Sequence, residues 1–324
     1  MARGRLGLLD VRCFDAVVRE GSFRRAASAL HLSQPAVSVH VKKLEQSLGT
    51  QLLRRTTRGS TLTDAGTAML PHLRSLLRAE ESTQQHAAAV AGKRFGRVRV
   101  AAVNSALTGL LPEAVRMVQS DHSAFDVEVA ELTSKAVADG VHDGTFDIGV
   151  AAHPVDASPQ LRVETLARSG LMLVAHEDHP LLHGPAVTRE IVASEPFVTL
   201  QPGYTLRDLA TEYLRPYPLR IAGEALNHDT VRRLVAARLG VTIMPNMTFE
   251  IVGKGQGLGA VPLADSDEII QLSMLHPGDL AAPATRAVSS AIRRVARRRF
   301  GSTATTRVHQ PLGEHSQPQR ERPG

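Results

Sequence analysis

Residues 21–49 constrain the fold most, because their pattern predicts two short helices joined by a tight turn. Ser22 can cap the first helix, in which apolar residues recur at helical spacing: Phe23, Ala26, Ala27 and Leu30. Ser33 can cap the second helix, and Pro35 in its first turn loses no hydrogen bond that the helix needs. The second helix has an apolar stripe of Val37, Val41, Leu44 and Leu48.

The polar residues of the second helix are expected to face outward: Ser33, Gln34, Ser38, His40, Lys42 and Lys43. From a helix in the DNA major groove, such groups can bind base edges and phosphates. The alternative is a helix pair packed for stability alone. The polar start of the second helix and the basic segment after it favour DNA binding.

Residues 51–62 are expected to form a hairpin with Gly59 at its turn. Arg54, Arg55 and Arg58 place three guanidinium groups there, which suits a wing that grips phosphates or enters a narrow minor groove. The alternative is a solvated basic loop.

The length of 324 residues predicts two or three domains. Aromatic residues make up 3% of the chain and Trp is absent, which disfavours stacking platforms for single-stranded nucleic acid. A single cysteine, Cys13, rules out an internal disulfide and is expected to pack within a helix. We find no signal peptide and no apolar run of membrane-spanning length, so we expect a cytoplasmic protein.

The net charge of +6 is distributed unevenly along the chain. Residues 1–97 carry +9, residues 98–285 carry −10, and residues 286–324 carry +7. A basic head beside an acidic middle fits a DNA-binding unit that carries a separate domain.

Thr63 is expected to cap a long helix that reaches about Val90 and is bent by Pro71. Its apolar residues form an imperfect, coiled-coil-like stripe: Leu62, Met69, Leu73, Leu76, Ala87 and Val90. Such a stripe needs a partner, and a second copy of the same helix is the simplest one.

From residue 97 the pattern alternates between strands and helices, which predicts βαβ units and a mainly parallel sheet. Strands are expected at 97–103, 125–132, 147–151, 171–175, 197–200, 241–244 and 272–275. Helices are expected at 107–119, 134–142, 206–214, 230–239 and 285–300. Residues 301–324 lack periodicity and are expected to form a disordered tail.

The chain resembles the LysR-type transcriptional regulators over nearly its full length, to about residue 300. The long match is FDAVVREGSFRRAASALHLSQPAVSVHVKKLEQSLGTQLLRRTTRGSTLTDAG, and RRLVAARLGVTIMP at 232–245 is a second one. DIGV at 147–150 and HPLL at 179–182 are weaker echoes. The chain departs from the family at His31, where a small turn residue is common, at Val39-His40, where a basic or polar residue often precedes Gln, and at Leu53, which replaces a frequent Phe.

The resemblance implies an α/β fold with an N-terminal, all-α winged helix-turn-helix domain and a two-lobed effector domain like the periplasmic binding proteins. The winged helix-turn-helix would span 1–62, the linker and dimerisation helix 63–92, and the effector domain 97–300. With chain crossings near 166–169 and 271–275, lobe one would hold 97–167 and 273–300, and lobe two 168–272.

A cleft between two such lobes is a good ligand site, because strand ends and helix N-termini converge there. The residues expected to bind an effector, with a preference for anions, are Ser105, Thr133, Gly203 and Thr205. Ser105 and Thr205 match places where related proteins contact effectors. The alternative is that each hydroxyl only caps its helix, which we favour for Ser134 and for the 227–229 segment.

The predicted function is a LysR-type regulator that binds an interrupted inverted repeat and responds to a small, anionic effector in the cleft. Ser33, Gln34, Pro35, Ser38 and His40 would approach bases, and Lys42, Lys43, Arg54, Arg55 and Arg58 would position the DNA backbone. Its partners would be double-stranded DNA, the effector, a second copy in a homodimer or homotetramer, and RNA polymerase, without a membrane.

The alternatives are an architectural DNA-binding protein without effector response, and an enzyme or solute-binding module with a DNA-binding head. Catalytic motifs, metal ligands and a cofactor are not expected. The 176–179 segment fits a polar turn rather than a metal site, and the glycine-rich 253–259 segment fits a surface loop.

Overall fold

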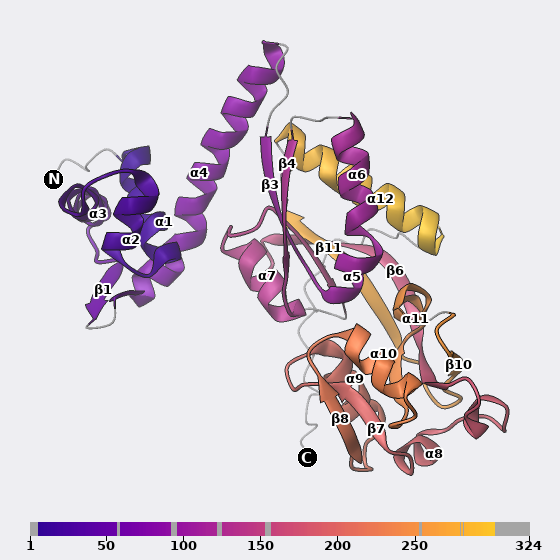
Figure 1. The fold of residues 1–324 in the computed structure, drawn as a ribbon. Helices are drawn as coiled ribbons and strands as arrows, with labels where there is room; N and C mark the ends of the chain where they lie inside the picture. The colour runs from indigo at the N-terminus through magenta and orange to yellow at the C-terminus, as the bar shows by residue number, and fades with distance from the viewer. Residues whose placement is uncertain are drawn as a thin grey trace, which may run out of the picture.

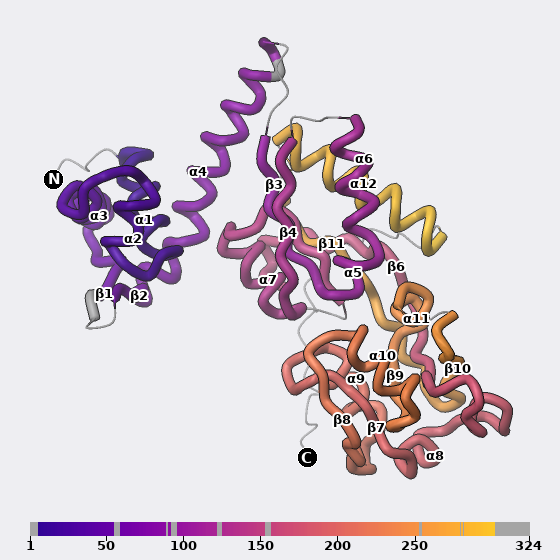
Figure 2. Tube along the Cα trace, in the orientation of Figure 1, coloured from indigo at the N-terminus to yellow at the C-terminus, as the bar shows by residue number. Residues whose placement is uncertain are grey.

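In the computed structural model, the structure describes residues 6–301 except 57–58, 92–95, 122–124, 153–156, 253–254, 279 and 281. The predicted tail at 302–324 lies outside the described residues. A small helical head, one long helix and a two-lobed α/β domain follow one another along the chain (Figure 1). The tube in Figure 2 shows that the long helix leaves the head and runs beside the first lobe.

The head is a three-helix unit with a two-stranded wing, as the family resemblance implied. Its helices are α1 (Leu8–Glu20), α2 (Phe23–Leu30) and α3 (Gln34–Leu48). Ser33 caps α3 as predicted, because its side chain accepts a hydrogen bond from the Ala36 N–H at 3.3 Å. Ser22 takes the N-cap position of α2 without a side-chain hydrogen bond. The head core includes Phe14, Leu44, Leu52 and, as predicted for the lone cysteine, Cys13.

The wing consists of β1 (Leu53–Thr56) and β2 (Gly59–Leu62), paired antiparallel. Gly59 is the first residue of β2 and pairs with Thr56, which places it at the turn end of the hairpin, as predicted. Its φ of 143° and the space around it both favour glycine, since a Cβ would come within 2.4 Å of the Gly21 carbonyl oxygen. The adjacent Ser60 N–H donates to that oxygen at 3.0 Å, which ties the wing to the corner between α1 and α2.

The long helix α4 spans Asp64–Val90, and Thr63 precedes it as predicted, accepting the Gly66 N–H at 2.9 Å. The early and late parts of its apolar stripe differ in burial. Leu73 is buried in the head core of the same chain, and Met69 packs against that core. Leu76 and Val90 are 42% and 91% exposed, so only the later part of the stripe is available to a second chain.

Lobe one is built on three parallel strands, β3 (Gly96–Ala102), β4 (Phe125–Glu131) and β5 (Ile148–Ala152). The helix predicted at 107–119 is instead two helices, α5 (Asn104–Gly109) and α6 (Leu111–Asp121). Leu110 separates the two, and Pro112, which lacks an N–H to continue a helix, falls in the first turn of α6. The remaining helices of the lobe are α7 (Ser134–His142) and α12 (Pro283–Phe300).

Two long strands connect the lobes, β6 (Leu161–His176) and β11 (Ile269–Pro277). They pair antiparallel with each other, and β11 also pairs antiparallel with β5. The end of β6 continues into lobe two, where it pairs antiparallel with β9 (Thr242–Pro245) and β10 (Leu258–Pro262). The seven-stranded sheet is therefore mixed, and the prediction of a mainly parallel sheet is wrong.

Lobe two also contains a parallel pair, β7 (Phe197–Leu200) and β8 (Ile221–Ala225). Its helices are α8 (Arg189–Ala193), α9 (Thr205–Tyr213), α10 (His228–Ala236) and α11 (Asn246–Val252), with a short 3-10 helix at Pro180–Leu182. The glycine-rich segment is not only a loop, since β10 begins at Leu258, while 253–254 lie outside the described residues. As predicted, a polar turn follows β6 after His176, at Glu177 and Asp178.

Candidate nucleic-acid interface and effector cavity

One face of α3 packs against α1 and α2, and the opposite face is open. Val37, Val41 and Leu44 are buried in the head core, as the predicted stripe required. The exposed side chains of α3 include two predicted base contacts and both predicted phosphate contacts: Gln34, Pro35, Lys42 and Lys43. The N-cap Ser33 is also exposed, and Ser38 is half-buried.

His40 lies at the border of the buried face and does not point freely outward. It is half-buried, and its Nδ1 lies 2.7 Å from Oδ1 of Asp10 in α1. Asp10 is only 2% exposed, and its other carboxylate oxygen, Oδ2, lies 3.8 Å from Nζ of Lys43. The predicted outward orientation of His40 is thus wrong, because a buried carboxylate draws the imidazole inward.

Val39 takes the place on the open face that we assigned to His40. At about 100° per residue, Val39 falls roughly opposite Val37 and Val41 on the helix, whereas His40 falls about 40° from the buried Leu44. The structure agrees, since Val39 is 64% exposed. Helical spacing alone could have identified this position, which our prediction of polar outward-facing residues omitted.

The wing carries Arg54, which is exposed and lies opposite Thr61 in the strand pair. Arg55 is in β1, but its side chain and the whole of Arg58 lie outside the described part of the chain. Glu45 near the end of α3 holds the wing in place, since its Oε1 accepts the N–H groups of Leu52 and Leu53 at 2.9 and 3.1 Å.

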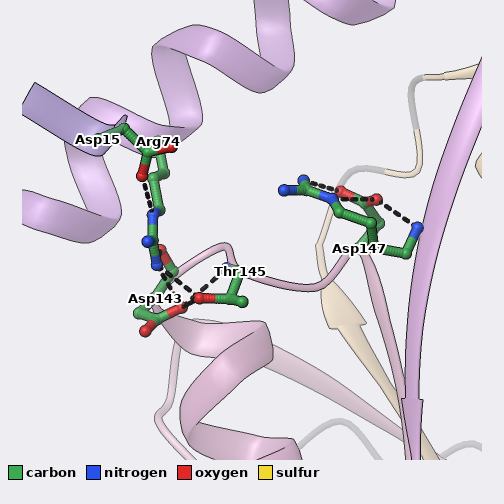
Figure 3. A network of polar contacts seen from close by, with 6 residues as sticks. Asp15, Arg74, Asp143, Thr145 and Asp147 are labelled. Atoms are coloured by element: carbon green, nitrogen blue, oxygen red, sulfur yellow. Dashed lines mark hydrogen bonds and ion pairs between the residues drawn. The ribbon is translucent and has the colours of Figure 1, made fainter. Parts of the chain in front are cut away.

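Arg74 of α4 joins the head to lobe one (Figure 3). The Nε of Arg74 donates to Oδ1 of Asp15 in α1 at 2.6 Å. Its Nη1 lies 2.8 Å from Oδ1 of Asp143 and donates to Oγ1 of Thr145 at 2.6 Å, both in the segment between α7 and β5. The Arg74 side chain is only 7% exposed, so this ion pair is largely shielded from water. Nearby, Asp147 accepts two hydrogen bonds from the Arg99 guanidinium.

A cavity of about 330 Å³ lies between the two lobes. Of the four residues predicted to bind an effector, Ser105, Thr133 and Thr205 line it. Gly203 does not line it; this glycine is exposed, and its φ of 90° serves the turn before α9. Four helices begin with a residue that lines the cavity: Asn104 of α5, Ser134 of α7, Thr205 of α9 and His228 of α10.

The capping role that we favoured for Ser134 belongs to Thr133, while both residues line the cavity. Thr133 is the N-cap of α7, and its Oγ1 accepts the Ala136 N–H at 3.4 Å. The Oγ of Ser134 donates to the Ala152 carbonyl at 2.9 Å and lies 3.0 Å from Oγ1 of Thr205. Ser134 and Thr205 therefore join the lobes across the cavity.

A second contact between the lobes also joins residues that line the cavity. Nδ1 of His228 lies 3.3 Å from Oδ1 of Asn104, whose Nδ2 donates to Glu131 at 3.1 Å. Burial lowers the pKa of His228 to about 4, so this imidazole is neutral near pH 7. Asn227 caps α10 as predicted, accepting the Thr230 N–H at 2.9 Å.

This winged helix-turn-helix head, long helix and two-lobed domain with an interlobe cavity define a ligand-responsive DNA-binding regulator. Two family models agree with it. "Bacterial regulatory helix-turn-helix protein, lysR family" matches residues 8–67, and "LysR substrate binding domain" matches residues 91–297. The chain belongs to the LysR family of transcriptional regulators, whose members combine DNA binding with an effector-binding domain.

Known proteins are similar along most of the chain. The HTH-type transcriptional regulator YnfL of Escherichia coli K12 is 30% identical over 279 residues, 83% of this chain and 92% of that protein. A full-length, single-substitution variant of OxyR from Pseudomonas aeruginosa shares the fold with a TM-score of 0.72 and 21% identity, covering 90% of this chain and 95% of that one. Full-length CbnR complexed with its target DNA shares the fold with a TM-score of 0.55 and 21% identity, and the match covers 89% of this chain and 99% of that one. Among the described residues, no helix is both long and apolar enough to span a membrane.

Proposed function

We propose that two copies of this chain bind an interrupted inverted repeat, and that a small monocarboxylate in the interlobe cavity changes how they bind or bend the DNA. The cavity itself carries this proposal, since four helices begin at its wall. The first-turn N–H groups of a helix favour negative charge.

The other lining groups narrow the effector class. The cavity walls are mostly apolar, and their described residues include no Lys or Arg. Glu131 adds one negative charge, and His228 is neutral near pH 7. One carboxylate on a compact apolar body suits such a site, whereas a second carboxylate would meet Glu131 without a cation to offset it. An effector would compete for the hydroxyls that now join Ser134 to Thr205.

We propose that Ser33, Gln34, Pro35 and Ser38 approach the bases and that Lys42, Lys43, Arg54, Arg55 and Arg58 contact the backbone. The exposure of α3 opposite its packed face supports this assignment. The exposed Leu76 and Val90 of α4 support pairing with a second copy, because such side chains lose contact with water in a dimer.

As a regulator rather than an enzyme, the protein would act in the cytoplasm, and its contact with RNA polymerase at a promoter follows from that role. Some relatives are named for hydrogen peroxide, such as the probable hydrogen peroxide-inducible genes activator of Streptomyces viridosporus. A thiol response to peroxide does not suit this chain. Its one cysteine, Cys13, is buried in the head, and burial and Asp10 raise the thiol pKa, which disfavours the reactive thiolate.

A thermal-shift screen of small carboxylates on the full chain tests this proposal. We expect stabilisation by at least one monocarboxylate and loss of that stabilisation in Thr205→Val, which keeps the side-chain shape but removes the hydroxyl. Ser120→Ala, which removes an exposed hydroxyl on α6, is the matched control and should respond as the parent does. If no small carboxylate stabilises the parent, or if Thr205→Val responds fully, the effector assignment is wrong.

A further inference from the structure

We propose that Val39 is a specificity-determining residue that reads the C5-methyl group of a thymine in each half-site. The inference rests on the proposed docking of α3 in the major groove. Val39 is 64% exposed and lies opposite the buried stripe of α3. A valine this exposed gains little from its surroundings in the free chain, and it would lose contact with water where the helix meets DNA.

The neighbours of Val39 sharpen the choice of base. Pro35 and Lys42 are exposed one turn before and about one turn after it, so Val39 lies near the centre of the open face. His40, the adjacent polar side chain, is held by Asp10 at 2.7 Å and is turned toward the buried side. The centre of this face therefore offers an aliphatic group to the base edges.

The major groove displays one apolar group, the thymine methyl, among hydrogen-bond donors and acceptors. Valine cannot satisfy a donor or acceptor, and placing it against guanine or cytosine edges would leave those groups without water. Contact with a methyl group suits Val39 best. The expected discrimination follows from the burial of one methyl group, about fourfold in affinity per half-site and about fifteenfold when both half-sites are changed.

The test uses deoxyuridine, which pairs like thymidine but lacks the methyl group. Duplexes bound by the full chain are selected from a random-sequence pool, and each thymidine of the selected site is then replaced singly by deoxyuridine. For the parent chain, a single replacement at one particular position, in either half-site, should weaken binding about fourfold. Val39→Ala should bind the unmodified duplex more weakly and should be insensitive to deoxyuridine at that position. Val129→Ala removes a similarly exposed valine (46%) from lobe one and should match the parent.

A second variant tests the position by a gain of specificity. Selection with Val39→Arg should replace the thymine at that position by guanine, which arginine recognises with two hydrogen bonds. Parent affinity that is unchanged by deoxyuridine at every thymine overturns the proposal, as does equal deoxyuridine sensitivity in Val39→Ala. Failure of the parent to select any sequence would instead contradict the docking of α3.

Discussion

The Arg74 bridge between the head and lobe one leads to the most demanding prediction. Replacing Arg74 by Ala removes the only cation within ion-pair distance of the Asp15 carboxylate among the described residues. Asp15 and Arg74 are 15% and 7% exposed at their side chains, so water replaces little of the lost interaction. Breaking a buried ion pair by removing one partner typically costs about 3–5 kcal/mol. Asp143 is more exposed and contributes less, so we expect about 3 kcal/mol in the free energy of unfolding.

This cost is measured by urea unfolding of the full chain, monitored with a spectroscopic signal from the head. Asp15→Asn combined with Arg74→Met should recover most of the loss, because it leaves no unpaired buried charge. Arg78→Ala is the comparison one turn along α4, since Nη1 of Arg78 is buried but has no hydrogen-bond partner among the described residues, so its removal breaks no hydrogen bond at that atom. Two results would refute the argument: a change below about 0.5 kcal/mol in Arg74→Ala, or equal losses of stability in Arg74→Ala and Arg78→Ala.

The bridge also predicts a functional effect. Arg74 contacts Asp15 in the head and Asp143 and Thr145 in lobe one, so it fixes the head relative to the effector domain (Figure 3). Arg74→Met should keep effector binding, measured by thermal shift, but weaken the effect of effector on DNA affinity. An unchanged ratio of DNA affinities with and without effector would show that coupling uses another contact.

Three further results are expected. The pKa of His228 is about 4 in the folded chain and about 6.5 in the unfolded chain, so between pH 6.5 and pH 4 mainly the unfolded state binds the proton. The free energy of unfolding should therefore drop by about 2 kcal/mol from pH 7 to pH 5. In His228→Asn this drop should be smaller by that amount. Leu73→Ala, in the head core, should cost about 2–5 kcal/mol in urea unfolding, whereas the same change at the exposed Leu76 should cost under 1. Gly59→Ala should distort the wing against the Gly21 carbonyl and weaken DNA binding in a gel-shift titration, while Gly255→Ala, where φ is also positive but nothing lies nearby, should leave DNA binding unchanged.

Local patterns were enough to predict the head, α4 and most helices of the effector domain. Ser33, Thr63 and Asn227 all make the capping hydrogen bonds that their positions suggest. The first half of strand β6 was not predicted, although it alternates apolar and polar residues, as a half-buried strand does. Its antiparallel pairing with β11, about a hundred residues later in the chain, could not be read from the local pattern.

In the candidate sites too, local sequence pattern predicted some residues, while the positions of others depend on tertiary contacts. Sequence placed Ser105 and Thr205 at the interlobe cavity, but it could not show that Ser134 rather than Thr133 would reach across to Thr205. That depends on which hydroxyl caps α7. The choice between Val39 and His40 differs, because helical spacing already places Val39 outward; the buried Asp10 then confirms that His40 turns inward.

Footprinting of the full chain on the DNA that flanks its own gene tests the central claim most directly. Two protected half-sites related by a two-fold axis, with centres separated by about 10 base pairs or a multiple of that, are the predicted result. A monocarboxylate that stabilises the protein should change the extent of protection or the bend between the half-sites. Continuous, salt-sensitive protection without preferred half-sites, unaffected by any such ligand, would contradict the account.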